Sequence, residues 1–332
     1  MKKILNDPFA YAEETLRGLV RAYPQYYRLI DGTTRVIARA DGPVAGKVGV
    51  VSGGGSGHLP VFTGYVGPGL LDACASGDVF ASPTAEEMAE AIRAANGGAG
   101  VLRLYGNYGG DVMNFDMAGD LVEFDDIAVT SVLLRDDVAS APFAERDKRR
   151  GVAGMVLAFK IAGAAAAAGL DLAGVTAVAQ RAADALRTMG VALSACTVPA
   201  AGKPTFSIGE DEMEIGMGIH GEPGVRRGPL LPARAVADQL LDPILADLSL
   251  GRGDRVAVLV NSLGATPAEE LFILFDRIAD RLADAGISIG NTLVGRYATS
   301  MEMAGASLTV LPLDAEFEAY LAAPAACAFW KV

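Results

Sequence analysis

Cysteine is scarce in this chain of 332 residues, and its placement excludes two classes of site. The three cysteines are Cys74, Cys196 and Cys327, a scattered and odd-numbered set without a CxxC pair. Such a set predicts neither a zinc site nor a disulfide framework. Each cysteine stands among small or apolar residues, so we expect buried, reduced thiols.

Positive charge is also in short supply. The chain has 28 lysines and arginines against 40 aspartates and glutamates, a net charge of −12. This balance disfavours nonspecific binding to nucleic acid or to an anionic membrane. The N-terminus lacks the long apolar stretch of a signal peptide, so we expect a cytoplasmic protein. The apolar run 151–170 has Lys160 at its centre and is rich in alanine and glycine, which favours a buried helix of a soluble protein over a membrane span.

Length and patterning predict an α/β protein with two domains. A chain of this length exceeds what one core usually organises, and strand-like runs alternate with helical patterns. We expect a boundary near Gly190, giving domains 1–190 and 191–332. The predicted strands are 47–51, 101–105, 127–134, 191–198, 213–219, 255–260, 293–294 and 308–311. The predicted helices are 11–23, 83–97 with Ser82 as N-cap, 152–168, 175–188 and 266–285.

The chain has only two histidines, His58 and His220, and both lie in glycine-rich segments. Histidine transfers protons near neutral pH, and its neutral imidazole is a nucleophile. Glycine lets the backbone approach a ligand closely. Two scarce reactive groups in such surroundings predict a functional site, although either histidine alone is more simply a loop residue.

The segment before His58 reads as a strand, a glycine turn and the start of a helix. It fails the P-loop pattern, because His58 and Leu59 stand where lysine and serine or threonine are needed, and it fails the dinucleotide-binding pattern as well. Backbone N–H groups of such a turn can still hold an anion or a hydroxyl oxygen.

Asp111 follows another predicted strand, in the turn Asn107–Asp111. Because ligands of open α/β sheets bind at the carboxyl ends of strands, we expect Asp111 and His58 to share one crevice. The alternative is that Asp111 is a helix N-cap or a turn acceptor. The two histidines lack the spacing of a zinc helix, and Ser56 lacks a nucleophile elbow, so neither a metal site nor hydrolase chemistry is predicted.

Five spaced motifs carry a resemblance to a known family. In chain order they are GGGSGH (53–58), GDVFASPT (77–84), NYGGDVMNFDMA (107–118), RRGVAG (149–154) and GMGIHGEPGV (216–225). Together they resemble the dihydroxyacetone kinase family, specifically its ketose-binding K subunit. The resemblance covers nearly the whole chain. It implies two α/β domains (DAK1/DegV-like) with sheets flanked by helices and a ketose site between the domains.

The resemblance also implies roles for individual residues. His220 corresponds to the histidine that adds to the ketone carbonyl as a hemiaminal, His58 to the acid/base histidine, and Asp111 to its partner. The backbone of Gly55, Ser56 and Gly57 would hold substrate hydroxyls.

Two positions depart from the family pattern. Gly106 replaces a substrate-contacting lysine, and Leu59 replaces a glutamate. Both changes remove charge beside the site, so we expect dihydroxyacetone or a relative such as the four-carbon ketose erythrulose as substrate.

No nucleotide-binding motif is found in the sequence. The resemblance implies that ATP or ADP with magnesium is bound by a separate, all-helical L-type subunit, and that the chain forms a homodimer. The chain alone is therefore predicted not to be a complete kinase, with no cofactor, nucleic acid or membrane of its own. The alternative is a dihydroxyacetone-sensing coactivator of a transcription regulator, which would need only the capturing His220.

Overall fold

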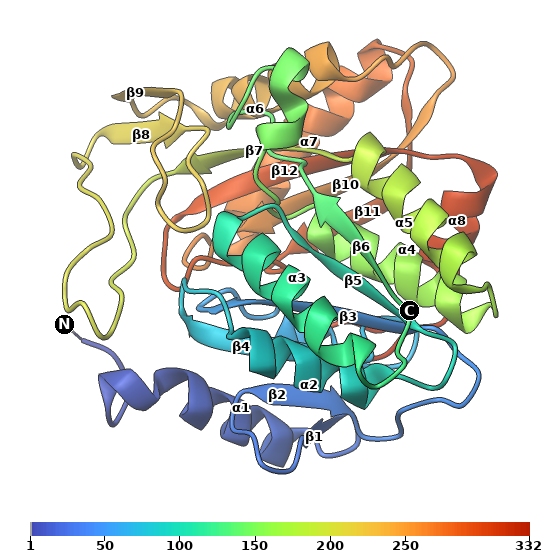
Figure 1. The fold of residues 1–332 in the computed structure, drawn as a ribbon. Coiled ribbons are helices and arrows are strands. Elements are labelled where there is room, and N and C mark those ends of the chain that lie inside the picture. The colour runs from blue at the N-terminus through green and yellow to red at the C-terminus, as the bar shows by residue number, and fades with distance from the viewer. Residues whose placement is uncertain (1) are drawn as a thin grey trace. The chain divides into compact units, whose positions relative to one another are not determined.

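The computed structural model describes residues 2–332, which form two compact units (Figure 1). The first unit comprises residues 2–134, Leu157–Arg181 and Tyr320–Val332. The second comprises Arg135–Val156 and Ala182–Ala319. The two units are therefore interleaved along the chain, whereas the sequence predicts a single boundary near Gly190.

The first unit is built on a six-stranded sheet with the order β1-β2-β4-β3-β5-β6. Strands β3 to β6 run parallel to one another, while β2 pairs antiparallel with both β1 and β4 at the edge of the sheet. The strands are β1 (Tyr27–Leu29), β2 (Val36–Arg39), β3 (Gly49–Ser56), β4 (Ala73–Val79), β5 (Val101–Gly106) and β6 (Val129–Leu134). The helices are α1 (Tyr11–Ala22), α2 (Ala85–Ala95), α3 (Gly109–Glu123) and most of α4 (Met155–Ala167) and α5 (Leu172–Ala185).

The core of the first unit lies where α2 and α3 cover the parallel strands. Met88 and Ile92 of α2 and Phe115 of α3 are completely buried there, in one cluster with Val51 and Val101 of the sheet. Burial of each such side chain stabilises the fold by about 1.5–3 kcal/mol. This packing fixes α3 on the sheet and thereby the position of its first turn.

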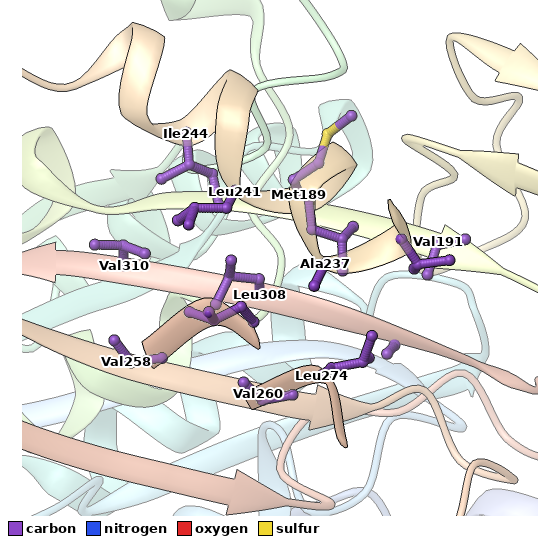
Figure 2. Close-up of a cluster of buried hydrophobic side chains, with 14 of the residues drawn as sticks. Met189, Val191, Ala237, Leu241, Ile244, Val258, Val260, Leu274, Leu308 and Val310 are labelled. Carbon is purple, nitrogen blue, oxygen red and sulfur yellow. The ribbon is translucent and has the colours of Figure 1, made fainter. Parts of the chain in front are cut away.

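The second unit contains a mixed six-stranded sheet with the order β11-β10-β12-β7-β8-β9. Its strands are β7 (Arg187–Ala192), β8 (Glu212–Ile215), β9 (Arg226–Pro229), β10 (Arg255–Ser262), β11 (Ser288–Gly295) and β12 (Gly305–Pro312). The helices are α6 (Ala233–Asp247), α7 (Ala268–Asp284) and the first part of α8 (Ala315–Ala322). Figure 2 shows part of the core: Leu241 and Ile244 of α6 and Leu274 of α7 belong to one buried cluster with Val258 and Leu308 of the sheet.

Most predicted elements are present, but several boundaries differ from the prediction: β8, for example, ends at Ile215 and not at 219, and β11 spans Ser288–Gly295 and not only 293–294. The predicted helix 175–188 ends at Ala185, and the next strand spans Arg187–Ala192 instead of 191–198, because this segment pairs with β12. Helix α2 is capped by Thr84, which forms a capping box with Glu87, and not by Ser82. Such a box satisfies two backbone N–H groups at the helix start, which a single cap at Ser82 could not do.

The alanine-rich run is a buried helix, as predicted. Helix α4 covers Met155–Ala167, and Gly163 lies so close to Gly69 that an added Cβ would be 2.6 Å from its carbonyl group. No helix within residues 2–332 is long and apolar enough to cross a membrane. The three cysteines are free and buried, in agreement with the prediction.

The C-terminal segment Tyr320–Val332 completes the first unit. The amide of Ala326 donates to the carbonyl of Pro68 at 3.0 Å, and the amide of Ala328 donates to the hydroxyl of Tyr27 at 3.1 Å. The Trp330 ring lies edge-on to Tyr65, with centroids 6.2 Å apart. The last residues of the chain therefore contact segments that lie near its beginning.

Lys160 in α4 provides a test of this packing through the pH dependence of stability. Its side chain is 0% exposed and donates to the carbonyl of Tyr320, and burial lowers its pKa from 10.5 to about 8. The unfolded chain keeps the Lys160 proton to higher pH than the folded chain, so stability should rise between these two pKa values. From about pH 7.5 to about pH 9.5 we expect the wild type to gain about 2 kcal/mol of unfolding free energy relative to Lys160→Met. Urea unfolding at both pH values measures this difference, and equal pH dependence of the two proteins would contradict it.

Candidate functional site

The glycine run before His58 belongs to strand β3, which extends to Ser56 instead of ending in a turn as predicted. Each of three glycines makes room for an aromatic residue. An added Cβ would lie 3.3 Å from the Phe115 ring at Gly53, 2.3 Å from the Phe62 ring at Gly54 and 2.7 Å from the Phe80 backbone at Gly55. The run therefore serves packing, the alternative that a glycine-rich segment leaves open beside backbone access to a ligand.

His58 follows this strand and is 1% exposed. Its ring stacks on Phe80 with centroids 4.9 Å apart and meets Phe62 edge-on at 6.0 Å. Both phenylalanines adopt left-handed backbone conformations, with φ of 60° and 72°. Such conformations cost about 1–2 kcal/mol each, so the packing around His58 holds the aromatic pair in place against local strain. A short 3-10 helix, Thr63–Tyr65, follows in place of the predicted helix start.

Asp111 lies in the first turn of α3, directly after strand β5, and is 5% exposed. It is not the N-cap, which is Tyr108, so the capping alternative does not hold. Burial and the nearby charge of Asp111 both raise the pKa of the Cys74 thiol on β4. The carboxylate therefore acts electrostatically on the interior of the sheet.

The connection between β4 and α2 contacts both His58 and helix α3, which carries Asp111. Phe80, which stacks on His58, opens the connection between β4 and α2. Further along this connection, the carbonyl of Pro83 accepts a hydrogen bond from Asn114 of α3 at 2.7 Å, and an added Cβ at Gly110 would be 2.6 Å from Ser82 Oγ. Because β3, β4 and β5 are parallel neighbours, the segments that bear His58 and Asp111 leave the same edge of the sheet.

The remaining substrate-binding candidates of this unit lie at the same strand ends. The Ser56 hydroxyl donates to the carbonyl of Gly77 at 2.6 Å and lies 3.0 Å from Ser76 Oγ, so it already has protein partners. Gly57 has φ +99°, a left-handed conformation that favours glycine. Gly106 is the buried last residue of β5, and Leu59 is half-buried beside His58.

His220 belongs to the second unit, in the loop after β8, and its side chain is 22% exposed. Its Nδ1 lies 2.9 Å from Oε1 of Glu222, and its backbone amide donates to Oε2 of the same carboxylate at 2.9 Å. Sequence reasoning did not single out Glu222. The signal was its position two residues after a scarce histidine, within the motif GMGIHGEPGV.

The two arginines of RRGVAG have different partners. Arg149 is 2% exposed and forms a bidentate pair with Asp247 at the end of α6, with distances of 2.9 and 2.6 Å. Arg150 forms an ion pair with Asp137 at 2.8 Å, and its other terminal nitrogen lies 3.8 Å from Glu222. Arg149 therefore anchors the segment, while Arg150 extends toward the carboxylate beside His220.

The carboxylate of Glu222 is held in its ionised form. Burial raises its pKa, but the hydrogen bond and charge of His220, together with the charge of Arg150, outweigh burial and lower the pKa to about 2. Asp137 shows the opposite balance: burial raises its pKa to about 6 although Arg150 lowers it.

The structure brings His58 and Asp111 to one edge of the first unit's sheet and places His220 in the second unit. That His58, Asp111 and His220 act together on one ketose therefore stays a prediction. Within residues 2–332 there is no group of three or more histidine, cysteine, aspartate or glutamate side chains arranged to hold a metal ion.

Comparison with known proteins places the chain among kinase components. It is 49% identical over 316 residues to the dihydroxyacetone-binding subunit of PTS-dependent dihydroxyacetone kinase 1 from Listeria innocua, covering 95% of each chain. It is 46% identical to D-erythrulose kinase from Mycolicibacterium smegmatis, covering 98% of this chain but only 56% of that enzyme. Among solved structures, the dihydroxyacetone kinase operon co-activator Dha-DhaQ matches with a TM-score of 0.89 and 32% identity, covering 96% of this chain and 98% of the co-activator.

The family model described as the Dak1 domain matches residues 17–329, nearly the whole sequence. The five motifs are thus distributed over one continuous match instead of over separate modules. Their residues lie at strand ends and in the adjoining loops and helix turns of two α/β units, which is the fold that the resemblance implied. The chain belongs to the Dak1 domain family.

Proposed function

We propose that this chain is the ketose-binding component of a dihydroxyacetone-type kinase. It would capture a short-chain ketose for phosphorylation of its terminal hydroxyl. The observation that carries the proposal is the presence of a buried His58 and Asp111 at one edge of the first sheet, in a chain that also has His220. A protein that only captured the ketose would need His220 alone.

Capture is proposed to occur at His220. The imidazole Nε2 would add to the ketone carbon and form a hemiaminal, a reaction that glycerol cannot undergo because it has no carbonyl group. Bond formation thus separates ketoses from similar polyols more sharply than hydrogen bonding to their hydroxyls. Tethering also fixes the terminal hydroxyl for attack on phosphorus, which reduces the entropic part of the barrier.

The proton of that hydroxyl is proposed to pass to Asp111 or His58 as the phosphoryl group arrives. Both side chains are buried, so a charge on either is poorly screened by water. A positioned general base of this kind contributes about 10²–10⁴-fold to the rate. The aromatic packing of His58 keeps its ring in one orientation for this role.

The phosphoryl donor is proposed to come from a nucleotide-carrying L-type subunit that holds ATP or ADP with magnesium, and the chain is proposed to form a homodimer. The Listeria innocua relative is itself described as a subunit, which supports an assembly of this kind. The test is to assay the purified chain with ketose and ATP, alone and with an L-type subunit. Ketose phosphorylation by the chain alone would refute the division between subunits.

A sensor function is the second candidate, since the co-activator Dha-DhaQ matches this fold along nearly its whole length. The two candidates differ in one measurement. A sensor would form the ketose adduct but support no phosphorylation with any L-type subunit, whereas a kinase component would do both.

Gly106 allows a test of which ketose is preferred. The family resemblance implies a lysine at this position, and the erythrulose kinase relative supports a larger ketose as substrate. We expect Gly106→Lys to lower kcat/KM for erythrulose relative to dihydroxyacetone by about tenfold, because a lysine side chain takes up the space for the additional carbon. Steady-state kinetics across C3 to C5 ketoses measures this ratio. A wild type that clearly prefers dihydroxyacetone would contradict the erythrulose proposal.

A further inference from the structure

We propose that Glu222 is a positioning residue for His220, held in place by Arg150 and Asp137. This inference rests on the proposed function, because it concerns the ring that would capture the ketose. It adds three residues to the site, none of which belongs to the acid/base pair at His58 and Asp111.

Glu222 holds its histidine at two points. Oε1 lies 2.9 Å from the ring Nδ1, and Oε2 accepts the backbone amide of His220 at 2.9 Å. The loop is closed by further backbone bonds, from the Gly218 amide to the Glu222 carbonyl and from the Gly221 amide to the Gly218 carbonyl, each 3.1 Å. Ring and backbone are therefore fixed relative to the same carboxylate.

The ionised state of Glu222 determines which ring nitrogen carries the proton. An ionised carboxylate only accepts hydrogen bonds, so the ring must donate from Nδ1. In the neutral imidazole the lone pair is then on Nε2, which is the nitrogen that attacks a carbonyl carbon. The lowered pKa of Glu222 supports this arrangement around neutral pH.

Arg150 lies beside the Glu222 carboxylate and is itself held by Asp137. Arg150 lies 3.8 Å from Glu222 Oε2, donates from Nε to Asp137 at 2.9 Å and donates to the carbonyl of Gly216 at 3.3 Å. Asp137 is 4% exposed and also accepts the amide of Ala139 at 3.1 Å. The guanidinium thus has fixed partners and cannot turn away from Glu222 without losing buried hydrogen bonds.

Gly218 provides the space for this arrangement. An added Cβ there would lie 2.2 Å from Oε2 of Glu222 and 2.5 Å from a terminal nitrogen of Arg150. Any larger residue at this position must displace the carboxylate, the guanidinium or both. The two charged side chains that pack over Gly218 thereby explain why glycine stands at this position of GMGIH.

During capture the carboxylate would stabilise the charge that develops on the ring. The Nε2 lone pair forms a bond to the ketone carbon, the carbonyl π pair moves to the oxygen, and that oxygen takes one proton from solvent. The ring, now substituted at Nε2 and protonated at Nδ1, is an imidazolium and forms an ion pair with Glu222. For metal-binding histidines, loss of the partner that orients the ring typically costs about 10–100-fold in affinity or activity, and we expect a loss of the same order here.

The test uses two variants and two NMR measurements on the full chain. The fraction of [2-¹³C]dihydroxyacetone or [2-¹³C]erythrulose bound as hemiaminal is read from the shift of the ketone carbon into the sp³ region. The Nδ1 proton of His220 is observed in protein labelled with ¹⁵N-histidine, which is simple to assign because the chain has two histidines. Glu222→Gln keeps the shape but not the charge, and Gly218→Ala displaces the carboxylate without changing it.

In both variants we expect an apparent ketose Kd about 10–100-fold higher than in the wild type. We also expect the low-field Nδ1 proton signal to be lost. Gly228→Ala and Glu269→Gln are the matched controls, since an added Cβ at Gly228 meets nothing within 4 Å and Glu269 is exposed in the first turn of α7. Thermal melting verifies that each variant is folded.

If Glu222→Gln forms the adduct and shows the Nδ1 signal as the wild type does, the positioning role is overturned. A wild type that forms no adduct with either ketose would instead overturn capture, the core of the proposed function. In that case the Nδ1 signal alone decides whether Glu222 fixes the protonated nitrogen, so the two failures are distinguishable.

Discussion

Replacement of His220 by alanine is expected to abolish covalent capture of the ketose. The imidazole is the proposed nucleophile, and no other histidine lies in the second unit. Without it the chain could bind the ketose only through hydrogen bonds, so the hemiaminal signal should disappear and kcat/KM with an L-type subunit should fall by at least about 10³-fold. Intact mass spectrometry and ¹³C NMR with labelled ketose measure the loss.

Glu269→Gln is a suitable control for this experiment, because it changes a polar side chain of the second unit that lies on the exposed first turn of α7. It should form the adduct like the wild type. An adduct that persists in His220→Ala would show that another group captures the carbonyl.

Replacement of Asp111 by asparagine should have the second largest effect, and on a different step. The amide keeps the size of the carboxyl group but cannot accept a proton, so kcat should fall by about 10²–10⁴-fold while the hemiaminal still forms. The control is Asp116→Asn in the same helix, whose side chain is exposed. The comparison requires both the coupled kinase assay and the adduct measurement.

The division of labour would be contradicted by either of two results. Wild-type kcat in Asp111→Asn would remove the carboxylate from the proton-transfer step. Loss of the adduct in the same variant would mean that Asp111 takes part in capture as well.

The fold class and the positions of the reactive residues followed from the sequence, because they depend on local patterns. Alternating apolar segments indicated α/β architecture, and the scarcity of histidine drew attention to His58 and His220. The placement of Asp111 at the same sheet edge as His58 followed from the rule for parallel strands, and the topology agrees with it.

Other features depend on contacts between distant residues and left no local signal. Arg150 reaches Glu222 across more than seventy positions of sequence, and nothing in RRGVAG distinguishes it from Arg149, which pairs with Asp247. The glycines of GGGSGH resembled a turn because their local composition is that of a turn. Their extended conformation becomes intelligible only with Phe62 and Phe80 packed against them.

The interleaving of the two units could not be inferred for the same reason. Segment 157–181 and segment 320–332 carry no change in composition that would assign them to the first unit. What assigns them is contact with residues of the first unit, Gly69 for segment 157–181 and Pro68 and Tyr27 for segment 320–332, which is a property of the folded chain.

The contribution of Tyr320–Val332 to the first unit also sets an order of events during synthesis. The ribosome delivers Tyr27 and Pro68 early, but their partners Ala328 and Ala326 are translated only after the residues of the second unit. Domains of most proteins fold in the order of their synthesis, whereas here the unit that begins first can be completed only after the whole second unit has been synthesised.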